Sequence, residues 1–168
     1  MDRVELQAAQ KPLKERYRAE PAAALITLRA DGKLDEEKIA CKVDTGRALV
    51  EAGLHPATGG NGAFACSGDM LLEALVACAG VTLRSVATSM ELDVTGSVHA
   101  EGELDFRGTL GVDREASVGF EAIRLRFDLV SDEPKEKLDK LLELTERYCV
   151  VGQTLAGGVS LEFGYSTS

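Results

Sequence analysis

Two cysteines far apart in the sequence are the side chains of this chain best suited to chemistry. Cys78 lies in the apolar segment LLEALVACAGVTL, and Cys149 lies at the end of a second helix-compatible stretch, in ERYCVVGQTL. A thiol in apolar surroundings is inert unless something converts it to the thiolate. If the fold brings the second thiol beside the first, one sulfur can be oxidised and the other can resolve it as a disulfide. The residue types therefore indicate either reversible thiol redox chemistry or two structural cysteines.

The other two cysteines have simpler expected roles. Cys41 falls on the inward face of a predicted strand and is expected to pack as a small hydrophobe. Cys66 comes just before a predicted helix, where a thiol pKa can be lowered, or it packs beneath the start of that helix. No two cysteines form a CxxC motif, and with only His55 and His99 available a zinc site is not expected. The sequence predicts no metal and no cofactor.

Composition limits the class of protein. The chain has 168 residues, of which 45% are hydrophobic, and its formal net charge is −9. This acidic balance argues against a nucleic-acid partner, because phosphate binding requires clustered Lys and Arg. The first residues contain no apolar signal-peptide core, so we expect a cytoplasmic protein. The longest apolar stretch, residues 71–90, carries Glu73 and Arg84 and predicts a buried helix rather than a membrane span.

The elements that must position the thiols follow from the periodicity of the sequence. Residues 1–22 predict a charged helical arm, which is followed by a single domain over residues 23–168. Alternating apolar residues predict a hairpin over residues 23–46, with its turn at the Ala-Asp-Gly step of residues 30–32. Residues 55–69 are rich in Gly and predict a loop.

Two predicted helices carry the thiols. Ser67 is a good N-cap for a helix over about residues 69–90, which contains the first thiol. The second helix begins after Ser131 or Asp132 as its cap, and Pro134 sits in the early turn that tolerates proline. The second thiol follows at the end of this helix.

The remaining segments predict strands. Residues 94–106 and 120–130 alternate between apolar and polar side chains, and a Gly-rich loop over residues 107–119 joins them. Residues 159–165 predict a last strand at the end of the chain. Strands, a buried helix, strands, an amphipathic helix and a final strand together predict an α+β fold.

The helix over residues 69–90 also predicts an assembly. It is apolar nearly all round and therefore needs cover on all sides. One short set of strands cannot provide that cover, whereas a second copy of the chain can. We therefore expect an intertwined homodimer.

Two motifs resemble a known family. The segment SGDMLLEALVACAGVTL resembles the central-helix signature of the OsmC/Ohr family, the osmotically induced and organic-hydroperoxide-resistance proteins. ERYCVVGQTL resembles the second-cysteine motif of that family, usually Cys-Pro-Val-x-x-Thr-Leu. The upstream TGGNG is similar to the Gly-rich loop of the family, and the order of elements matches over roughly Leu25 to Phe163.

The resemblance implies a peroxiredoxin-type hydroperoxide reductase. In the family the first cysteine, matching Cys78, attacks the peroxide and becomes a sulfenic acid, and the second, matching Cys149, condenses with it to a disulfide. A dithiol, typically a lipoyl group, then reduces the disulfide without metal or flavin. For this chain a thioredoxin-type dithiol is the alternative reductant. The family fold implies antiparallel sheets wrapped around long central helices in an intertwined homodimer, with active sites at the subunit interface.

The resemblance also implies an arginine that stabilises the reacting charge. Arg keeps its charge when buried, and a carboxylate can hold its fork. Arg29, in LRADG, is the nearest match to the family position, and Arg47, in DTGRALV, is the alternative. Either residue can equally be a solvated surface arginine.

The carboxylate partner of that arginine departs from the family pattern. The family places a Glu ten residues before the first cysteine, usually after Pro, but this chain has Gly68 preceded by Ser67. Asp69 is adjacent, and Glu73 lies within the helix as the other candidate. A Glu in an otherwise apolar helix needs a partner, so Glu73 is expected to bind an Arg or the second subunit.

The sequence thus predicts a cytoplasmic, homodimeric thiol peroxidase of the oxidative stress response that reduces organic hydroperoxides. Two alternatives remain open: a non-catalytic module that binds a small ligand, and a stress-response protein whose cysteines are structural or protect without turnover.

Overall fold

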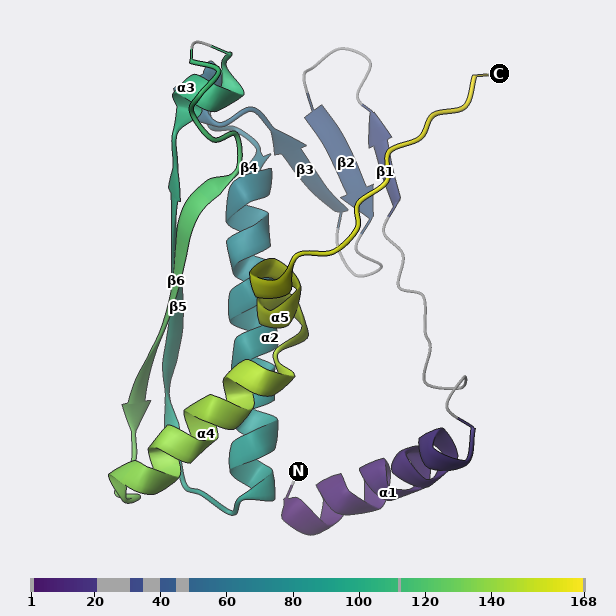
Figure 1. The fold of residues 1–168 in the computed structure, drawn as a ribbon, viewed down its shortest axis with the longest axis vertical. Helices are drawn as coiled ribbons and strands as arrows, with labels where there is room; N and C mark the ends of the chain where they lie inside the picture. Colours follow the sequence, from purple (N-terminus) through teal and green to yellow (C-terminus); the bar gives the residue numbers. More distant parts are fainter. Residues whose placement is uncertain (1, 21–30, 35–39, 45–48, 112, 168) are drawn as a thin grey trace. The chain divides into compact units, whose positions relative to one another are not determined.

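A computed structural model describes residues 2–20, 31–34, 40–44, 49–111 and 113–167. The chain forms two compact units, which are described separately (Figure 1). Unit 1 comprises Met1–Glu73 and His99–Arg126, and unit 2 comprises Ala74–Val98 and Phe127–Ser168. The predicted strand around residues 25–29 lies outside the described residues, as do the side chains of Arg29 and Arg47.

Unit 1 begins with helix α1 (Arg3–Ala19), in the segment where the helical arm is expected. A sheet of order β1-β2-β3-β4 follows, with β1 at Asp31–Leu34, β2 at Ala40–Asp44, β3 at Leu49–Gly53 and β4 at Ala65–Cys66. The first two pairings are antiparallel, and the short β3–β4 pairing is parallel. The sequence does not predict strand β3, because its five residues are too few to show a clear alternation of apolar and polar side chains.

The hairpin exists, but the predicted position of its turn is wrong. Asp31 pairs with Asp44 and Leu34 pairs with Cys41, so the Asp-Gly step lies inside β1. A Gly permits a turn but does not require one, and the register is set by pairing along the whole strand.

The Gly-rich segment after β3 is mostly loop, as predicted, but it contains a short 3-10 helix, η2 (Pro56–Thr58). His55 caps this turn, and its Nδ1 accepts a hydrogen bond of 3.0 Å from the Ala57 N–H. The His55 ring stacks on Phe106 with 5.0 Å between ring centroids. His55 therefore has a local structural role in unit 1.

Helix α2 (Ser67–Ser89) begins two residues before its predicted start. Its buried residues recur at every fourth position: Leu75, Ala79, Leu83 and Ala87. In the single chain one face of α2 is exposed, with Val81 at 71%, and the cover expected from a second copy stays a prediction. By length and composition α2 could cross a membrane, and 22% of its most apolar window is buried in the single chain. One such helix is weak evidence for a membrane span.

Strands β5 (Thr95–Leu104) and β6 (Phe120–Val130) form a two-stranded sheet. The strands run antiparallel, because Thr95 bonds to Val130 at one end and Arg124 pairs with Glu103 toward the other. The bounds of β6 agree with the prediction, and its half-buried side chains alternate with exposed ones. The predicted loop between the strands contains the short helix α3 (Phe106–Thr109).

Helix α4 (Lys135–Tyr148) is present, but the predicted cap is wrong. The N-cap is Pro134, with no side-chain cap hydrogen bond. The Ser131 hydroxyl instead donates to the Asp93 carbonyl at 2.6 Å and accepts from the Glu133 N–H at 3.2 Å. The hydroxyl therefore ties two connections together and is not available to the helix.

Unit 2 holds the main hydrophobic core. It joins α2, α4 and the paired ends of β5 and β6 through these residues: Leu83, Ala87, Leu92, Val94 and Leu141, with Val86, Met90, Phe127, Leu129 and Leu138 packed around them. This core contains the helix that leads to the second thiol. An α+β arrangement of helices and small antiparallel sheets is thereby confirmed.

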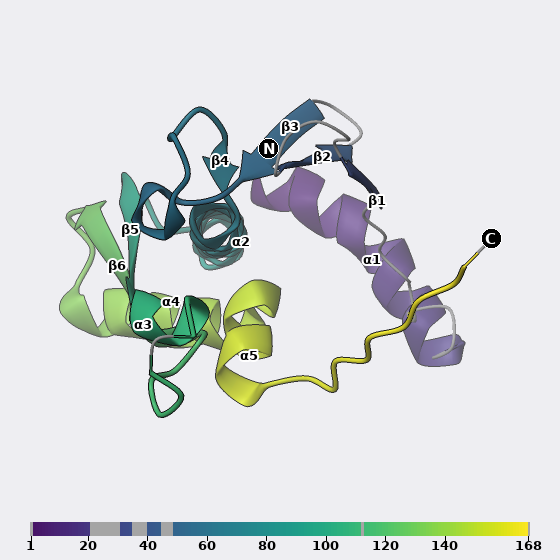
Figure 2. The same cartoon turned by 90° about the horizontal axis from the view of Figure 1, so that it is seen from above.

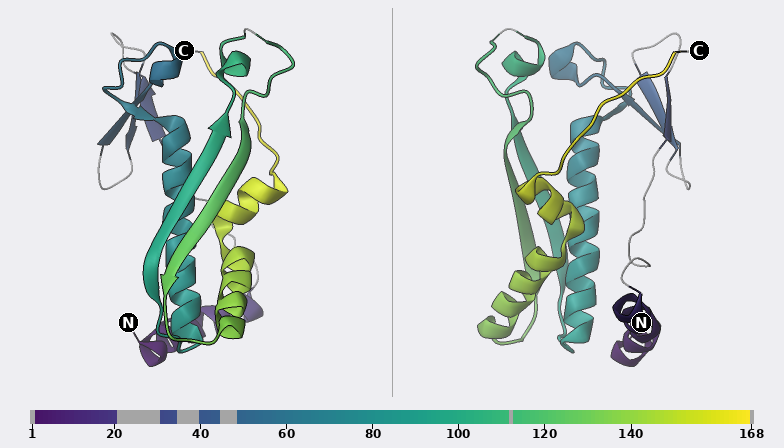
Figure 3. Two further views of the ribbon diagram at one scale, coloured as in Figure 1. Left: turned by 90° about the vertical axis from the view of Figure 1, so that its left-hand side faces the viewer. Right: turned by 45° about the vertical axis from the view of Figure 1, so that its right-hand side comes forward.

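The strand predicted over residues 159–165 is not formed. The segment leaves α5 (Val150–Gly157) as an extended trace without secondary structure (Figure 3). Its alternating apolar side chains are exposed, with Phe163 at 91% and Tyr165 at 93%. A strand is stabilised by backbone pairing with a neighbour, and alternation alone does not supply that neighbour.

Gly96 is a position in β5 that we expect to reject any side chain. Its φ is +138°, and an added Cβ would lie 2.0 Å from the Asp128 carbonyl oxygen. Gly96→Ala is expected to lower the free energy of unfolding by about 1–3 kcal/mol, because both strain and the clash must be relieved. Urea unfolding followed by circular dichroism measures this. Gly119→Ala, where a Cβ meets nothing within 4 Å, is the matched control and should change little.

Candidate active site

The structure brings Cys78 and Cys149 together within unit 2. Cys78 comes from the middle of α2, and Cys149 lies at the junction of α4 and α5, which Figure 2 shows as two helices meeting at a bend. The two thiols are close enough for each to shift the pKa of the other, and both are free. Segments distant in the sequence thus supply one thiol pair.

The backbone around Cys149 fixes the position of its sulfur. Cys149 is both the C-cap of α4 and the N-cap of α5, with φ −72° and ψ 102°. Its N–H donates to the Thr145 carbonyl at 2.9 Å, and its carbonyl accepts from the Gln153 N–H at 2.8 Å. Its sulfur accepts from the Gly152 N–H at 3.4 Å, and the residue is only 3% exposed. The sequence did not predict α5, whose eight residues include Gly152 and Gly157.

The surroundings of Cys78 favour the thiolate. Burial works against the charge, but hydrogen bonds from the Val151 N–H, the Cys149 thiol, the Val150 N–H and the Thr82 hydroxyl outweigh it and hold the pKa of Cys78 below its usual value. The Thr82 hydroxyl also donates to the Cys78 carbonyl at 2.8 Å, so its single proton serves one acceptor at a time. The backbone amides of α5 and the neighbouring thiol are therefore the steady donors.

The pKa of the second thiol, Cys149, is shifted in the opposite direction. Burial raises the pKa of Cys149, and the hydrogen bond to Cys78 and the charge on Cys78 raise it further. The N–H groups of Gly152 and Val151 oppose this rise only in part. The pair is thus asymmetric, because Cys78 loses its proton more readily than Cys149 does. A thiolate is the nucleophile in thiol chemistry, so this geometry favours attack by Cys78.

The structure describes only the carboxylates among the other predicted site residues. Arg29 and Arg47 lie outside the described residues. Glu73 is exposed on α2, and no partner is recorded for it among the residues that the structure describes. Asp69 is exposed in the first turn of α2. Whether an arginine acts on the thiolate therefore remains a prediction.

Gly68 has apolar surroundings, although the motif that this segment resembles has Glu at the same position. A Cβ added at Gly68 would lie 3.5 Å from the Phe120 ring, 3.6 Å from the Cys66 sulfur and 3.8 Å from Leu104. A carboxylate here would lose solvation without a visible partner among the described residues. Cys66 itself is half-buried beside this position and packs at the start of α2.

Polar neighbours of Cys149 turn away from its sulfur. The Gln153 amide donates to the Glu146 carbonyl at 2.9 Å, which ties α5 to α4. Tyr148 is exposed, and the Arg147 guanidinium lies 5.6 Å from the centre of its ring. Both residues thus stabilise the helix junction.

The guanidinium of Arg84, a cation on α2, binds a backbone carbonyl. Its Nη1 donates to the Val94 carbonyl at 2.6 Å. Arg84 lines a groove of about 530 Å³ beside α2, together with these residues: Val76, Ala77, Gly80, Leu83, Asp93, Val94, Thr95, Gly96, Ser97, Val98 and Leu129. The groove is largely apolar and runs along the exposed small residues of the helix.

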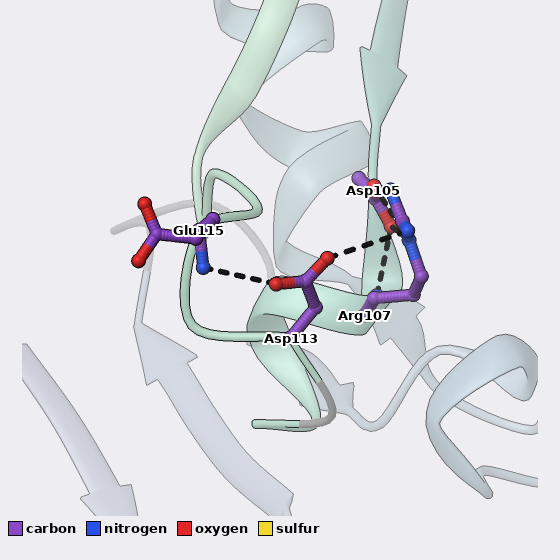
Figure 4. Close-up of polar contacts among 4 residues, drawn as sticks. All are labelled: Asp105, Arg107, Asp113 and Glu115. Carbon is purple, nitrogen blue, oxygen red and sulfur yellow. Dashed lines mark hydrogen bonds and ion pairs between the residues drawn. The ribbon is translucent and has the colours of Figure 1, made fainter.

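A polar cluster at α3 in unit 1 has a local explanation. Asp105 caps α3 and pairs with Arg107, which also reaches Asp113 at 3.4 Å (Figure 4). The Asp113 carboxylate in turn accepts from the Glu115 N–H at 3.0 Å. Arg107 is largely exposed, so these pairs fix the loop and contribute little energy. Among the described residues no group of His, Cys, Asp and Glu side chains could hold a metal ion.

Comparisons with known proteins bear on the family of this chain. The sequence pattern of OsmC-like proteins matches residues 59–164, which include both thiols. A search of curated proteins finds no match.

Solved structures share the fold at low identity. An OsmC-like protein from Mycoplasma pneumoniae superimposes with a TM-score of 0.66 at 14% identity, covering 79% of this chain and 89% of that one. An organic hydroperoxide resistance protein from Elizabethkingia anophelis has a TM-score of 0.56 at 17% identity, covering 80% and 91%. The organic hydroperoxide resistance protein OhrB of Bacillus subtilis has a TM-score of 0.51 at 18% identity, covering 80% and 94%.

These identities establish the fold alone, whereas the sequence pattern covers well over half of the chain. Its match to the two thiol-bearing segments and the Gly-rich loop before α2 agrees with the fold. The chain belongs to the family of OsmC-like proteins.

Proposed function

We propose that this protein is a cytoplasmic, thiol-dependent peroxidase that reduces organic hydroperoxides. The observation that carries the proposal is the pairing of two free thiols from distant segments, with the pKa of Cys78 lowered and that of Cys149 raised. Family membership, and solved relatives named for organic hydroperoxide resistance, support a peroxidase-like or stress-related role.

The proposed reaction has three balanced steps. The Cys78 thiolate attacks one oxygen of the hydroperoxide, an S–O bond replaces the O–O bond, and the alkoxide leaves and takes a proton to become the alcohol. The Cys149 sulfur then attacks the sulfenic acid on Cys78, forming the disulfide and releasing water. A lipoyl- or thioredoxin-type dithiol finally reduces the disulfide and is itself oxidised.

Arg29 is the proposed stabiliser of the reacting charge, and Arg47 is the alternative. A guanidinium retains its charge in an apolar site and can bind both peroxide oxygens. The exposed carboxylate of Glu73 is the proposed partner of such an arginine, in the same chain or in a second subunit, with Asp69 as the other candidate.

The proposed enzyme is a homodimer. Two features support this assembly: the exposed apolar face of α2 beside the groove, and the unpaired apolar alternation of the C-terminal segment. A second copy would cover the first and give the second a strand partner. Sedimentation equilibrium should give twice the chain mass of 17.9 kDa. Val81→Glu should reduce dimerisation, whereas Val130→Glu, a substitution of matched exposure, should not.

The test of the proposed function is stoichiometric oxidation followed by mass spectrometry. One equivalent of an organic hydroperoxide should give an intrachain Cys78–Cys149 disulfide faster than free cysteine reacts, and a dithiol should restore both thiols for repeated turnover. A protein that only binds small ligands should react no faster than free cysteine. A protein that protects without turnover should oxidise once and resist re-reduction.

A further inference from the structure

The two cysteines of the thiol pair differ in how far solvent reaches them. Cys149 is 3% exposed, whereas Cys78 is half-buried. The disulfide of the proposed reaction must be reopened by a dithiol from solution. Thiol–disulfide exchange requires the attacking thiolate to reach one of the two sulfurs, so access decides which sulfur is attacked first.

The position of Cys78 on α2 explains its partial exposure. Residues three apart on a helix are neighbours on its surface. Leu75, three residues before Cys78, is 4% exposed, whereas Val81, three residues after it, is 71% exposed. Cys78 therefore lies at the edge of the buried stripe of α2, with solvent on one side.

Cys149 is enclosed by the helix junction in which it lies. Its N–H is bonded within α4 and its carbonyl within α5, so an outward movement of the residue would break both helix ends. The Gly152 N–H lies 3.4 Å from its sulfur. A Cβ added at Gly152 would lie 3.3 Å from that sulfur and 3.8 Å from Leu75 Cδ1, so the Leu75 side chain reaches the same point from α2. Gly152 and Leu75 thus close around the Cys149 side chain.

We propose that the reducing dithiol enters at the Cys78 sulfur and that Cys149 is the leaving group, because Leu75 and Gly152 shield the Cys149 sulfur from solution. The order of these steps rests on the proposed function, since it concerns the disulfide that the proposed peroxidase forms. Leu75 is in this respect a positioning residue, which acts by controlling access to a sulfur.

The exchange balances in two steps. A thiolate of the reductant attacks the Cys78 sulfur, a bond between reductant and Cys78 replaces the Cys78–Cys149 bond, and the Cys149 sulfur leaves with the electron pair and takes a proton. The second thiolate of the reductant then attacks the reductant sulfur of this mixed disulfide. The reductant leaves as its own disulfide, and Cys78 is released as a thiolate.

Leaving-group chemistry alone favours the opposite order. The pKa of Cys78 is lowered and that of Cys149 is raised, and a thiol of lower pKa leaves faster. Attack on Cys149 would therefore expel the better leaving group. This preference changes the rate gradually, whereas a thiolate that cannot reach a sulfur does not react with it at all. The two effects predict different products, so a product analysis separates them.

The decisive measurement locates the first mixed disulfide in the wild-type protein. Diamide, which takes one hydrogen from each thiol, forms the Cys78–Cys149 disulfide without any peroxide. A short pulse of 2-mercaptoethanol, a small thiol with no second sulfur, then opens it, and acid stops the exchange by protonating the thiolates. Pepsin digestion and mass spectrometry locate the adduct. The adduct on Cys78 should exceed that on Cys149 by at least about tenfold. An adduct mainly on Cys149, or equally on both, would overturn the proposal.

Two controls test the physical reason for this preference. In urea, where the fold shields neither sulfur, the two adducts should form in similar amounts, and a preference that persists there would overturn the explanation by shielding. Leu75→Ala should raise the share of adduct on Cys149 several-fold. Leu83→Ala, which truncates another buried leucine of α2 within the core, should leave that share unchanged. Equal ratios in the two folded variants would overturn the role of Leu75.

Failure of this inference is distinguishable from failure of the proposed function. Diamide replaces the hydroperoxide, so entry at Cys78 in a protein that consumes no hydroperoxide supports the inference and refutes the peroxidase. Efficient peroxide turnover with the adduct on Cys149 supports the peroxidase and overturns the inference.

Discussion

Cys78→Ser is expected to slow hydroperoxide consumption by at least about 1000-fold, because it removes the nucleophile of the proposed reaction. A serine hydroxyl cannot ionise under conditions in which the thiol does, and the amides of α5 cannot compensate for that difference. Consumption is measured with an organic hydroperoxide and a dithiol reductant in excess. Retention of full turnover by Cys78→Ser would refute the assignment.

Two further cysteine variants make this result specific. Cys149→Ser should consume about one equivalent of hydroperoxide and then stop, because the sulfenic acid on Cys78 has no resolving thiol. Dimedone should trap that sulfenic acid as a mass increase on the Cys78 peptide. Cys66→Ser, at the start of α2, should retain turnover and serves as the control for thiol loss in general.

Leu141→Ala is expected to lower the free energy of unfolding by about 2–5 kcal/mol. Leu141 is 0% exposed and lies at the centre of the unit 2 core, against α2 and the paired strand ends. Removing its branched end leaves a cavity between elements that cannot close around it. Urea unfolding at fixed protein concentration, followed by circular dichroism, measures the change.

Leu142→Ala is the matched control, because it makes the same change one residue later in α4. Leu142 is 37% exposed, so its truncation should cost less than half as much as that of Leu141. Equal losses for the two variants would show that the core of unit 2 does not depend on Leu141.

The core and the thiol pair are connected through α4. Leu141 accepts at its carbonyl from the buried Thr145 hydroxyl at 2.7 Å, and the Thr145 carbonyl accepts from the Cys149 N–H. Packing of one face of α4 therefore sets the position from which the second sulfur meets Cys78. Loss of Leu141 is expected to loosen the thiol pair as well as to destabilise the domain.

Local patterns were sufficient for the elements that one segment can specify. The alternation in residues 120–130 predicted β6 with its observed bounds. Successive side chains of a strand point to opposite faces, so a half-buried strand alternates between apolar and polar residues. The spacing of apolar residues likewise predicted α2 and α4. The motifs around Cys78 and Cys149 predicted the family, and the fold agrees with it.

Patterns failed where a competing partner decided the outcome. Ser131 was expected to cap α4, but its hydroxyl bonds to the Asp93 carbonyl, a group 38 positions away in the sequence. The predicted turn at residues 30–32 became part of β1, since pairing with β2 fixed the register. The C-terminal alternation formed no strand in the single chain, where it has no paired neighbour.

The sequence by itself determined that two thiols lie in helix-forming segments and that these segments belong to a thiol-bearing family. Only the tertiary structure decided which sulfur loses its proton more readily. That difference depends on the burial of each sulfur and on the backbone N–H groups near it, which come from an eight-residue helix whose N-cap is Cys149 itself. Hydrogen bonds between α2 and α5 exist only after packing brings the helices together, so no local pattern records them.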